Sequence, residues 1–495
     1  MMSSLPDLTQ LSHTQKDELI RLLWPLQQQV QDLMGQMAVM QGRIRQLEGR
    51  LALNSQNSSK PPSSDGLGKP APKSLRKSGQ KPNGGQKGHS GNTLRQSAHV
   101  DETVTHQVPG HCSVCQLELH APLIEHMIAE TRQVFELPQL KMRTVEHHQM
   151  RATCVCGAVH LGVWPAGLTA PVQYGASVKA MAVHLNQYHL LPLARTAALM
   201  QDCYGVPLSQ ASVQSFAQEA ALAVRPTVQA IGQAVQASRV VHADETGIRV
   251  RGHLHWLHCA VTGTLTWLAP HAKRGTQAFE ALGLLGGIRG VLVHDGLISY
   301  KALDCTHSLC NAHHIRELVY VHEQEGEKIW DCWAQEMIDL LLQALREVDA
   351  KAGPLHLGRQ AWFEGQWSQL LQRGEALNPQ NHRTGTSQDA GLAARGRLKQ
   401  SKASNLLKRL REHRLDVWRF MREDGVPFTN NLAEQALRMA KVKQKISGCF
   451  RTEHGADTFF TIRSYLATMH KQKANLLDCL VSAFNRQTIQ PCFDG

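Results

Sequence analysis

Residues 239–247 read Arg-Val-Val-His-Ala-Asp-Glu-Thr-Gly, and residues 290–296 read Gly-Val-Leu-Val-His-Asp-Gly. Each is a short β-branched run that ends in an acid, Asp244 in the first and Asp295 in the second. Such runs predict buried strands, and residues 255–269 between them predict a hairpin followed by a helix. The pattern therefore changes from helices to strands at this point of the chain.

Two acids at the ends of neighbouring strands suit a site for two divalent cations. Hard divalent ions prefer carboxylate oxygens, and a rigid sheet fixes their positions. One ion would activate a water or a 3′ hydroxyl, and the other would stabilise the leaving oxygen of a phosphoryl transfer. Asp244 and Asp295 taken singly are also compatible with turn or capping residues.

A third acid is needed, and the segment 429–434, Thr-Asn-Asn-Leu-Ala-Glu, supplies Glu434. At helical spacing Glu434 shares one face with three cations, a pattern that suits a metal beside phosphates. The cations are Arg438, Lys441 and Lys445. Asn431-x-x-Glu434 is also compatible with a capping box, and the charged face with a salt-bridged surface helix.

The first segment, residues 14–53, predicts a helix with a heptad seam, and Pro25 is placed where it can begin that helix. The a positions are Val30, Met37, Ile44 and Leu51, and the d positions are Leu26, Leu33, Met40 and Leu47. We expect a coiled coil that makes a homodimer or higher oligomer, with packing on its own domain as the alternative.

Residues 54–98 form a basic linker rich in Pro, Gly and Ser, which we expect to be flexible. The net charge is +12, and clustered cations here and in residues 395–422 fit a DNA backbone better than a small anion. The linker cations expected to contact DNA are Lys60, Lys69, Lys73, Arg76, Lys77, Lys81 and Lys87.

Residues 99–165 have the spacing of a small zinc-binding module. Cys112-Ser-Val-Cys115 and Cys154-Val-Cys156 form two knuckles, whose four thiolates would close a structural, tetrahedral Zn²⁺ site. His111 and His160 are substitutes for one Cys, strand-like runs at 130–137 and 143–153 lie between the knuckles, and unliganded thiols are the alternative. Twelve Cys in a chain without a secretion signal argue against a disulfide framework.

Residues 171–236 predict helices at 175–191 and 193–204, then a helix from 210 to 223 capped by Ser209. This pattern is compatible with a helix-turn-helix that contacts DNA, and equally with plain helical packing. No apolar run is long enough to span a bilayer, and the N-terminus does not read as a secretion signal, so we expect a cytoplasmic protein without membrane contact.

Three motifs resemble hallmarks of the insertion sequence 66 family of DDE transposases. They are Asn57-Ser-Ser-Lys-Pro-Pro-Ser-Ser-Asp65, Cys310-Asn-Ala-His313, and Thr429-Asn-Asn-Leu-Ala-Glu434 with Arg438. The order of segments also matches along the whole chain. The chain departs from the family at Asn311, where an aromatic residue is common, and in the sparser basic residues after His313.

The resemblance implies an RNase H-like α/β core in residues 239–315 and 426–495, interrupted by a helical insertion at 316–425, in a chain that is mostly α. It also implies that Asp244, Asp295 and Glu434 are the acidic triad. Helical periodicity at 330–348 and 398–421, with a turn-rich loop at 378–390, agrees with the insertion.

The implied activity is that of a bacterial, nucleoid-associated transposase. It would bind the ends of its element, cut them to expose a 3′ end and join that end to target DNA. Mg²⁺, or Mn²⁺ in its place, is the expected ion, and companion proteins of the same element are possible partners. A zinc-dependent regulator that binds DNA without cutting, and a general RNase H-like nuclease, are the competing hypotheses.

His313 stays open at this stage. It is compatible with an auxiliary role beside DNA, with a second metal site formed with Cys305, His307 and Cys310, and with a satisfied histidine in the core.

Overall fold

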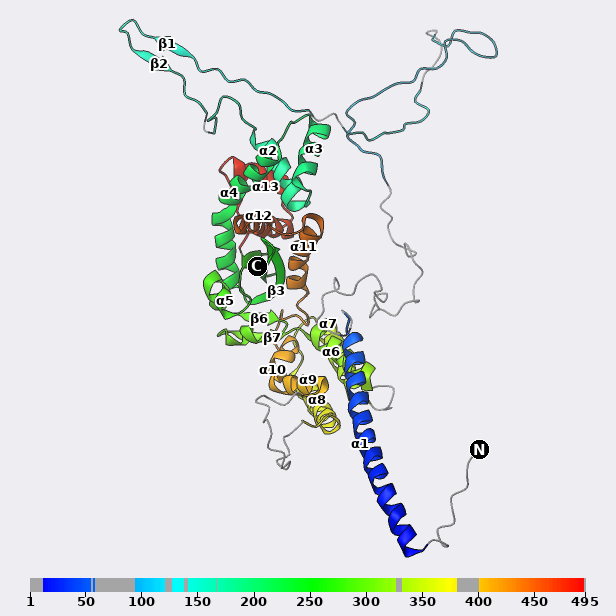
Figure 1. Cartoon of the computed structure of the whole chain (residues 1–495). Helices are drawn as coiled ribbons and strands as arrows, with labels where there is room; N and C mark the ends of the chain where they lie inside the picture. The colour runs from blue at the N-terminus through cyan, green and yellow to red at the C-terminus, as the bar shows by residue number, and fades with distance from the viewer. Residues whose placement is uncertain are drawn as a thin grey trace.

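The computed structural model describes residues 12–54, 57, 94–120, 127–137, 141–165, 167–325, 332–380 and 400–493. A five-stranded mixed sheet lies at the centre of the main body, in the order β5-β4-β3-β6-β7 (Figure 1). The strands are β3 (Val240–Val250), β4 (His253–Val261), β5 (Thr266–His271), β6 (Val291–His294) and β7 (Thr306–Leu309). The first three run antiparallel, whereas β6 is parallel to β3 and β7 is parallel to β6.

Strand β3 continues well past Asp244, so the expectation that this strand ends at the acid is wrong. Residues 245–250 remain extended because each pairs with a residue of β4, ending with Val250 opposite His253. Arg251 and Gly252 join the two strands with φ values of 52° and 79°. Two residues with positive φ match the twist of an antiparallel hairpin.

Both faces of the sheet are covered by helices, which gives three layers around the central strand. On one face, Val241 and Ala243 of β3 are buried against α4 (Gln210–Ala237) and α5 (Thr276–Leu282). On the other face, Ile248 and Val250 of β3 are buried against α11 (Asn431–Ser447) and α12 (Glu453–Lys471). Because side chains alternate along a strand, Asp244 belongs to the α11 face.

The helices of residues 171–237 pack on the same body as the sheet. They are α2 (Ala176–Val183), the π-helix η3 (His184–Tyr188), α3 (Leu193–Tyr204) and α4. The predicted cap of α4 is present, since the Ser209 hydroxyl accepts the amide of Ser212 at 3.0 Å. The helix runs beyond residue 223 because its apolar stripe continues through buried Ile231 and Val235. Packing against α12 and α13 (Leu476–Phe484) therefore accounts for this helix.

A helical insertion separates β7 from α11. It comprises α6 (Asn311–Glu325), α7 (Trp333–Lys351), α8 (Leu357–Leu377), α9 (Lys402–Glu412), α10 (Arg414–Val417) and η6 (Arg419–Met421). Its core contains buried Trp333, Trp367 and Trp418. The helical periodicity at 398–421 predicted one long basic helix, and this prediction is wrong. The chain turns near His413, which allows Trp418 and its neighbours to be buried. Short 3₁₀ turns η4 (Leu285–Gly287) and η5 (Ile298–Ala302) flank β6.

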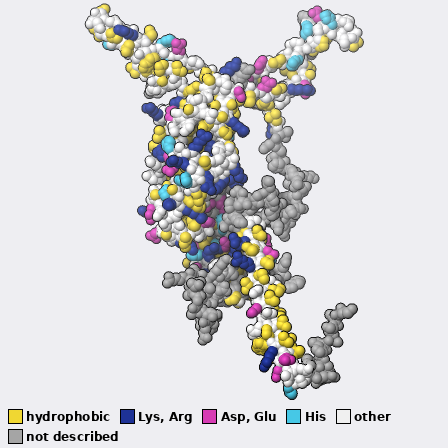
Figure 2. Space-filling view, in the orientation of Figure 1, with side chains coloured by type: hydrophobic (Ala, Val, Ile, Leu, Met, Phe, Trp, Pro, Cys, Tyr) yellow, Lys and Arg dark blue, Asp and Glu magenta, His cyan; other side chains and the backbone are white. Residues whose placement is uncertain are grey.

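The helix α1 (His13–Leu51) extends away from this body (Figure 1). Ser12 and Gln15 form its capping box, so Pro25 lies inside the helix and not at its start. Apolar side chains are exposed along its length (Figure 2). Its C-terminal end meets the insertion, where the Tyr320 hydroxyl donates to the Gly49 carbonyl at 3.2 Å.

Two arms leave the top of the body in Figure 1. One carries the hairpin of β1 (Arg151–Thr153) and β2 (Val159–Leu161), and the other carries residues 94–120 and 127–137. The expected strand at 130–137 is wrong, since residues 130–137 are without regular secondary structure. The chain is thus mostly helical around a mixed sheet. Within the described ranges, no helix is both long enough and apolar enough to cross a membrane.

Replacement of Gly290 by Ala is expected to lower the free energy of unfolding by about 1–3 kcal/mol, as overpacking does. A Cβ at Gly290 would lie 2.4 Å from the carbonyl oxygens of Ser238 and Arg239, which are backbone atoms that cannot turn aside. Gly286→Ala is the matched control, because a Cβ there meets no atom within 4 Å. Urea unfolding measures both, and equal stability of the two variants would contradict the expectation.

Candidate functional site

Asp244 and Asp295 are brought together by the parallel pairing of β3 and β6. His242 pairs with Val293, so the chain carries both acids to the same edge a few residues later. Carboxylate oxygens of Asp244, Asp295 and the neighbouring Glu245 all lie within 4.8 Å of one another. This geometry places the first two sequence-predicted acids in one cluster.

The turn after β6 fixes the Asp295 carboxylate. Gly296 has φ of 92°, a left-handed conformation that favours glycine. Its amide donates to His294 Nδ1 at 3.0 Å, and the amide of Leu297 donates to Asp295 Oδ1 at 2.9 Å. The His-Asp-Gly sequence is therefore a local device that holds the carboxylate at the end of the strand.

Glu434 reaches the same region from the first turn of α11. The buried Asn430 occupies the N-cap position of this helix. It ties the helix to β3, because its side-chain amide donates to the Ala243 carbonyl at 2.8 Å. Asn430 Oδ1 also lies 2.9 Å from His242 Nδ1. The capping-box alternative at Asn431 is wrong, since Asn430 occupies the cap position and Asn431 is exposed.

Unbalanced negative charge is the main electrostatic feature of the cluster. Burial raises the pKa of Asp244 well above its usual value, and the charges of Glu245, Asp295 and Glu434 raise it further. Like charges that are buried together disfavour ionisation, whereas a nearby cation restores it. The site therefore has the carboxylate oxygens and the excess negative charge that suit a hard divalent cation.

Glu245 is a site residue that the sequence analysis missed. Its side chain is fully buried, Arg274 donates to Oε1 at 2.9 and 2.7 Å, and the Tyr300 hydroxyl donates to Oε2 at 2.6 Å. The Arg274 guanidinium also stacks on Trp256, 4.6 Å from the ring centroid, and remains 43% exposed. Glu245 thus anchors a cation at the rim of the acidic cluster. In the sequence, only its position directly after Asp244 indicated that Glu245 belongs to the site.

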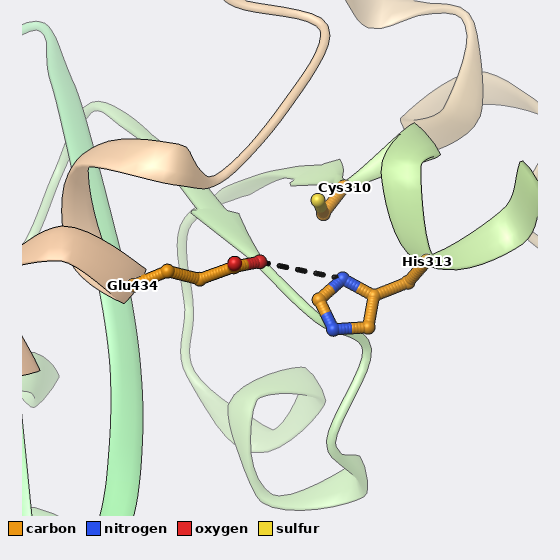
Figure 3. A group of neighbouring side chains, drawn as sticks. All are labelled: Cys310, His313 and Glu434. Carbon is orange, nitrogen blue, oxygen red and sulfur yellow. Dashed lines mark ion pairs between the residues drawn. The ribbon is translucent and has the colours of Figure 1, made fainter. Parts of the chain in front are cut away.

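His313 of α6 faces Glu434 from the insertion (Figure 3), and Arg316 of the same helix lies close to the same carboxylate. His313 Nδ1 lies 4.0 Å from Glu434 Oε1, and Arg316 Nη2 lies 3.9 Å from Oε2. Burial lowers the pKa of His313, and the positive charge of Arg316 lowers it further. Neither His313 Nδ1 nor Glu434 Oε1 has a hydrogen-bond partner among the described residues. His313 therefore faces Glu434 in a long ion pair without the hydrogen bond that a satisfied core histidine would make.

The alternative metal set around His313 is only partly assembled. Cys310 and His313 come together with Glu434, whereas His307 lies elsewhere, 3.1 Å from His294 and near the Leu303 carbonyl. Asn311, the departure from the family pattern, is buried and donates to the Val417 carbonyl at 3.0 Å.

The predicted DNA contacts on α11 divide into two kinds. Arg438 and Lys445 are exposed. Many Lys and Arg side chains lie on the face of the body that Figure 2 shows. Lys441 is half-buried and donates to the Gly247 carbonyl of β3, so it also secures the helix. The linker cations lie outside the described residues: Lys60, Lys69, Lys73, Arg76, Lys77, Lys81 and Lys87.

The four cysteines of the expected zinc module form two separate pairs, one on each arm. In the first pair, the turn at Cys112 closes through a hydrogen bond from the Gln116 amide at 3.0 Å. In the second, the amide of Gly157 donates to the Cys154 carbonyl at 2.8 Å. Backbone hydrogen bonds lower the pKa of Cys112 and of Cys154. Each pair is a local knuckle, but in the described part of the chain no three-ligand group includes any of the four.

Comparison with known proteins gives a family match over most of the body. A model described as the transposase IS66 family matches residues 171–458, which is more than half of the chain. A second model, described as a family of unknown function, matches residues 3–95. No curated protein matches the chain.

Asn430→Ala is expected to lower the free energy of unfolding by about 1–3 kcal/mol, because the Ala243 carbonyl and His242 would lose a buried partner. Asn431→Ala, one residue later on the exposed side, is the control and should change stability by less than about 0.5 kcal/mol. Chemical unfolding measures both, and a neutral Asn430→Ala would refute the anchoring role.

Asp244→Asn is expected to raise the unfolding midpoint of the protein in EDTA at neutral pH. A carboxyl whose pKa is raised by folding contributes stability at pH below its unfolded pKa, and that contribution is lost as pH rises through the folded pKa. The amide mimics the neutral form, so the gain should shrink in acid. Asp304→Asn, at an exposed position, is the control. An unfolding midpoint that Asp244→Asn lowers at neutral pH would contradict this expectation.

Proposed function

Because the chain belongs to the IS66 family of transposases, we propose that it binds the ends of an insertion element and catalyses metal-dependent cleavage and joining of DNA strands. The observation that carries this proposal is the cluster of Asp244 and Asp295 at one edge of the sheet. Glu434 lies near enough for its charge to raise the pKa of Asp244. A regulator that only binds DNA has no need of this buried charge.

The architecture supports an RNase H-like core. Its central strand β3 has an antiparallel meander on one side and two parallel strands on the other, with helices on both faces. The third acid follows a long helical insertion between β7 and α11. This agrees with the split catalytic domain that the sequence resemblance implies.

Asp244, Asp295 and Glu434 would hold Mg²⁺, or Mn²⁺ in its place. The donor set fits, since it consists of carboxylates whose mutual repulsion a cation would relieve. When bound, two such ions supply activation of a water or 3′ hydroxyl and stabilisation of the leaving oxygen. Because backbone amides hold the carboxylates of Asp244 and Asp295 in place, these two acids would need little reorganisation to bind a cation.

Cations around the cluster would position the phosphate backbone. Arg274 is fixed by Glu245 and Trp256 while part of its guanidinium stays exposed. A guanidinium held in this way is preorganised for bidentate binding of a phosphate. Arg438 and Lys445 of α11 extend the basic surface away from the acids.

The helix α1 would pair two copies of the chain. Leu26, Leu33 and Leu47 at d positions are 46–58% exposed, and the a positions of the same seam are 49–86% exposed. An exposed heptad seam on a long helix is typical of a coiled-coil partner surface. Two protomers would in turn hold two element ends, with companion proteins of the same element as further partners.

Structural Zn²⁺ remains part of the proposal only as a link between the arms. Cys112 with Cys115, and Cys154 with Cys156, each supply half of a tetrahedral set. As the arms stand, the two halves are apart, so the four residues do not fit one ion in this arrangement. No step of the proposed chemistry depends on this link.

Cleavage of end-labelled element-end DNA tests the proposal, with purified protein in Mg²⁺ or in EDTA. Asp295→Asn is expected to lower cleavage at least about a hundredfold, because a carboxylate ligand is lost, while DNA binding is retained. Asp304→Asn, exposed and outside the cluster, should cleave like the unaltered chain.

Three outcomes would contradict the proposal in different ways. Binding without Mg²⁺-dependent cleavage, also after companion proteins are added, would favour the DNA-binding regulator. Cleavage that does not depend on the end sequence would favour a general nuclease. Undiminished cleavage by Asp295→Asn would remove this acid from the site.

A further inference from the structure

Two buried polar atoms face each other between α6 and α11 in a long ion pair, without a hydrogen bond to any described residue. They are Glu434 Oε1 and His313 Nδ1, 4.0 Å apart, and neither has a hydrogen bond to a described residue (Figure 3). An unpaired buried polar atom costs about 1–3 kcal/mol, so native proteins rarely keep two of them in opposition. This arrangement indicates a position for a ligand.

Cys310 completes the group around this position. It lies directly before α6, one helical turn ahead of His313, and the ligating atoms of Cys310, His313 and Glu434 all lie within 4.8 Å of one another. Figure 3 shows the imidazole and the carboxylate directed toward each other, with the thiol beside them. Sulfur, nitrogen and oxygen therefore converge from two different helices.

We propose that Cys310, His313 and Glu434 form a second metal site, selective for a thiophilic divalent cation such as Zn²⁺. A thiolate and an imidazole select borderline-soft ions, whereas Mg²⁺ prefers oxygen ligands alone. The Asp244 and Asp295 cluster, which offers only carboxylates, is the hard site, so the two sites differ in the metals they take.

The surroundings of the thiol suit a metal-bound sulfur. The amide of Asn430 donates to Cys310 Sγ at 3.2 Å, in the manner of the amides that stabilise bound thiolates. Cation binding would form a metal–sulfur bond in place of the S–H bond of Cys310 and release the thiol proton to solvent.

Arg316 is compatible with the site because it approaches the other carboxylate oxygen. Its Nη2 lies 3.9 Å from Glu434 Oε2, which leaves Oε1 directed toward His313. Arg316 would then fix the orientation of the carboxylate while Oε1 acts as a ligand.

The sharing of Glu434 makes the second site regulatory, and this step rests on the proposed function. Glu434 cannot serve the acidic cluster fully while Cys310 and His313 hold it toward α6. Zn²⁺ would therefore inhibit Mg²⁺-dependent cleavage by withdrawing the third acid. The same contact links the insertion, through α6, to the catalytic residues.

Binding of Co²⁺ to the full chain tests the site without any assay of activity. Co²⁺ replaces Zn²⁺ and gives a thiolate charge-transfer band, so the spectrum of Cys310→Ser is subtracted from that of the unaltered chain. The difference cancels signals from the two cysteine pairs of the arms. We expect a band that is lost in Cys310→Ser. Cys305→Ser, which changes a half-buried cysteine outside the group, should retain that band.

Two more variants protect the test against misfolding of Cys310→Ser. His313→Asn and Glu434→Gln keep the thiol but each remove one ligand, and each is expected to weaken Co²⁺ binding at this site at least about tenfold. Circular dichroism verifies the fold of every variant. An unchanged spectrum and affinity in the variants that fold would overturn the proposal.

Inhibition by Zn²⁺ tests the regulatory step. Zn²⁺ should lower the Mg²⁺-dependent cleavage by the unaltered chain, and Cys310→Ser should need at least about tenfold more Zn²⁺ for the same fractional loss of its own rate. Equal sensitivity of the two would overturn the regulatory role. A chain that binds Co²⁺ at Cys310 but never cleaves DNA would refute the proposed function and leave the second site standing.

Discussion

The hydrogen bond from Asn430 to the Ala243 carbonyl connects the two halves of the candidate site. Asp244 follows Ala243 on the central strand, and Glu434 lies one turn after Asn430 in α11. More than 180 residues separate the two partners in the chain. The positions of the acids relative to one another therefore depend on this buried amide more than on either element alone.

A buried cluster of acids is held together against its own repulsion. The pairing of β3 with β6 sets Asp244 and Asp295 side by side, and backbone amides hold both carboxylates. The Glu245 amide donates to Asp244 Oδ1, and the Leu297 amide donates to Asp295 Oδ1. Burial, together with the repulsion between these carboxylates, raises the pKa of Asp244. A cation in the proposed site would relieve this repulsion, and a ligand stabilises the state that it binds.

The sequence predicted the residues of the site better than their contacts. Asp244 and Asp295 were found because strand-end acids leave a local pattern, and Glu434 because its motif resembles a family signature. The role of Glu245 was missed, since its partners Arg274 and Tyr300 follow 29 and 55 residues later and nothing local announces them. The full length of β3 was missed for the same reason, because pairing with β4 overrides the strand-ending character of Glu-Thr-Gly.

The two cysteine pairs illustrate the opposite limit. Spacing predicted each knuckle, because a tight turn brings its two sulfurs together within a few residues. Spacing does not determine whether the two knuckles meet. That depends on the relative position of the two exposed arms, which the local sequence does not set. Local chemistry was therefore predictable from the sequence, and assembly was not.

Helix α6 is where the remaining parts of the molecule meet. Its N-terminal turn carries His313 and Arg316 to Glu434, whereas its later turns meet α1, through Tyr320 to Gly49 and through Glu323 to the Asn57 side chain at 2.8 Å. Asn57 opens the linker motif and is buried at this contact. A single rigid helix thus joins the proposed partner surface to the third acid. The insertion therefore connects the exposed helix α1 with Glu434, the acid proposed as the third metal ligand.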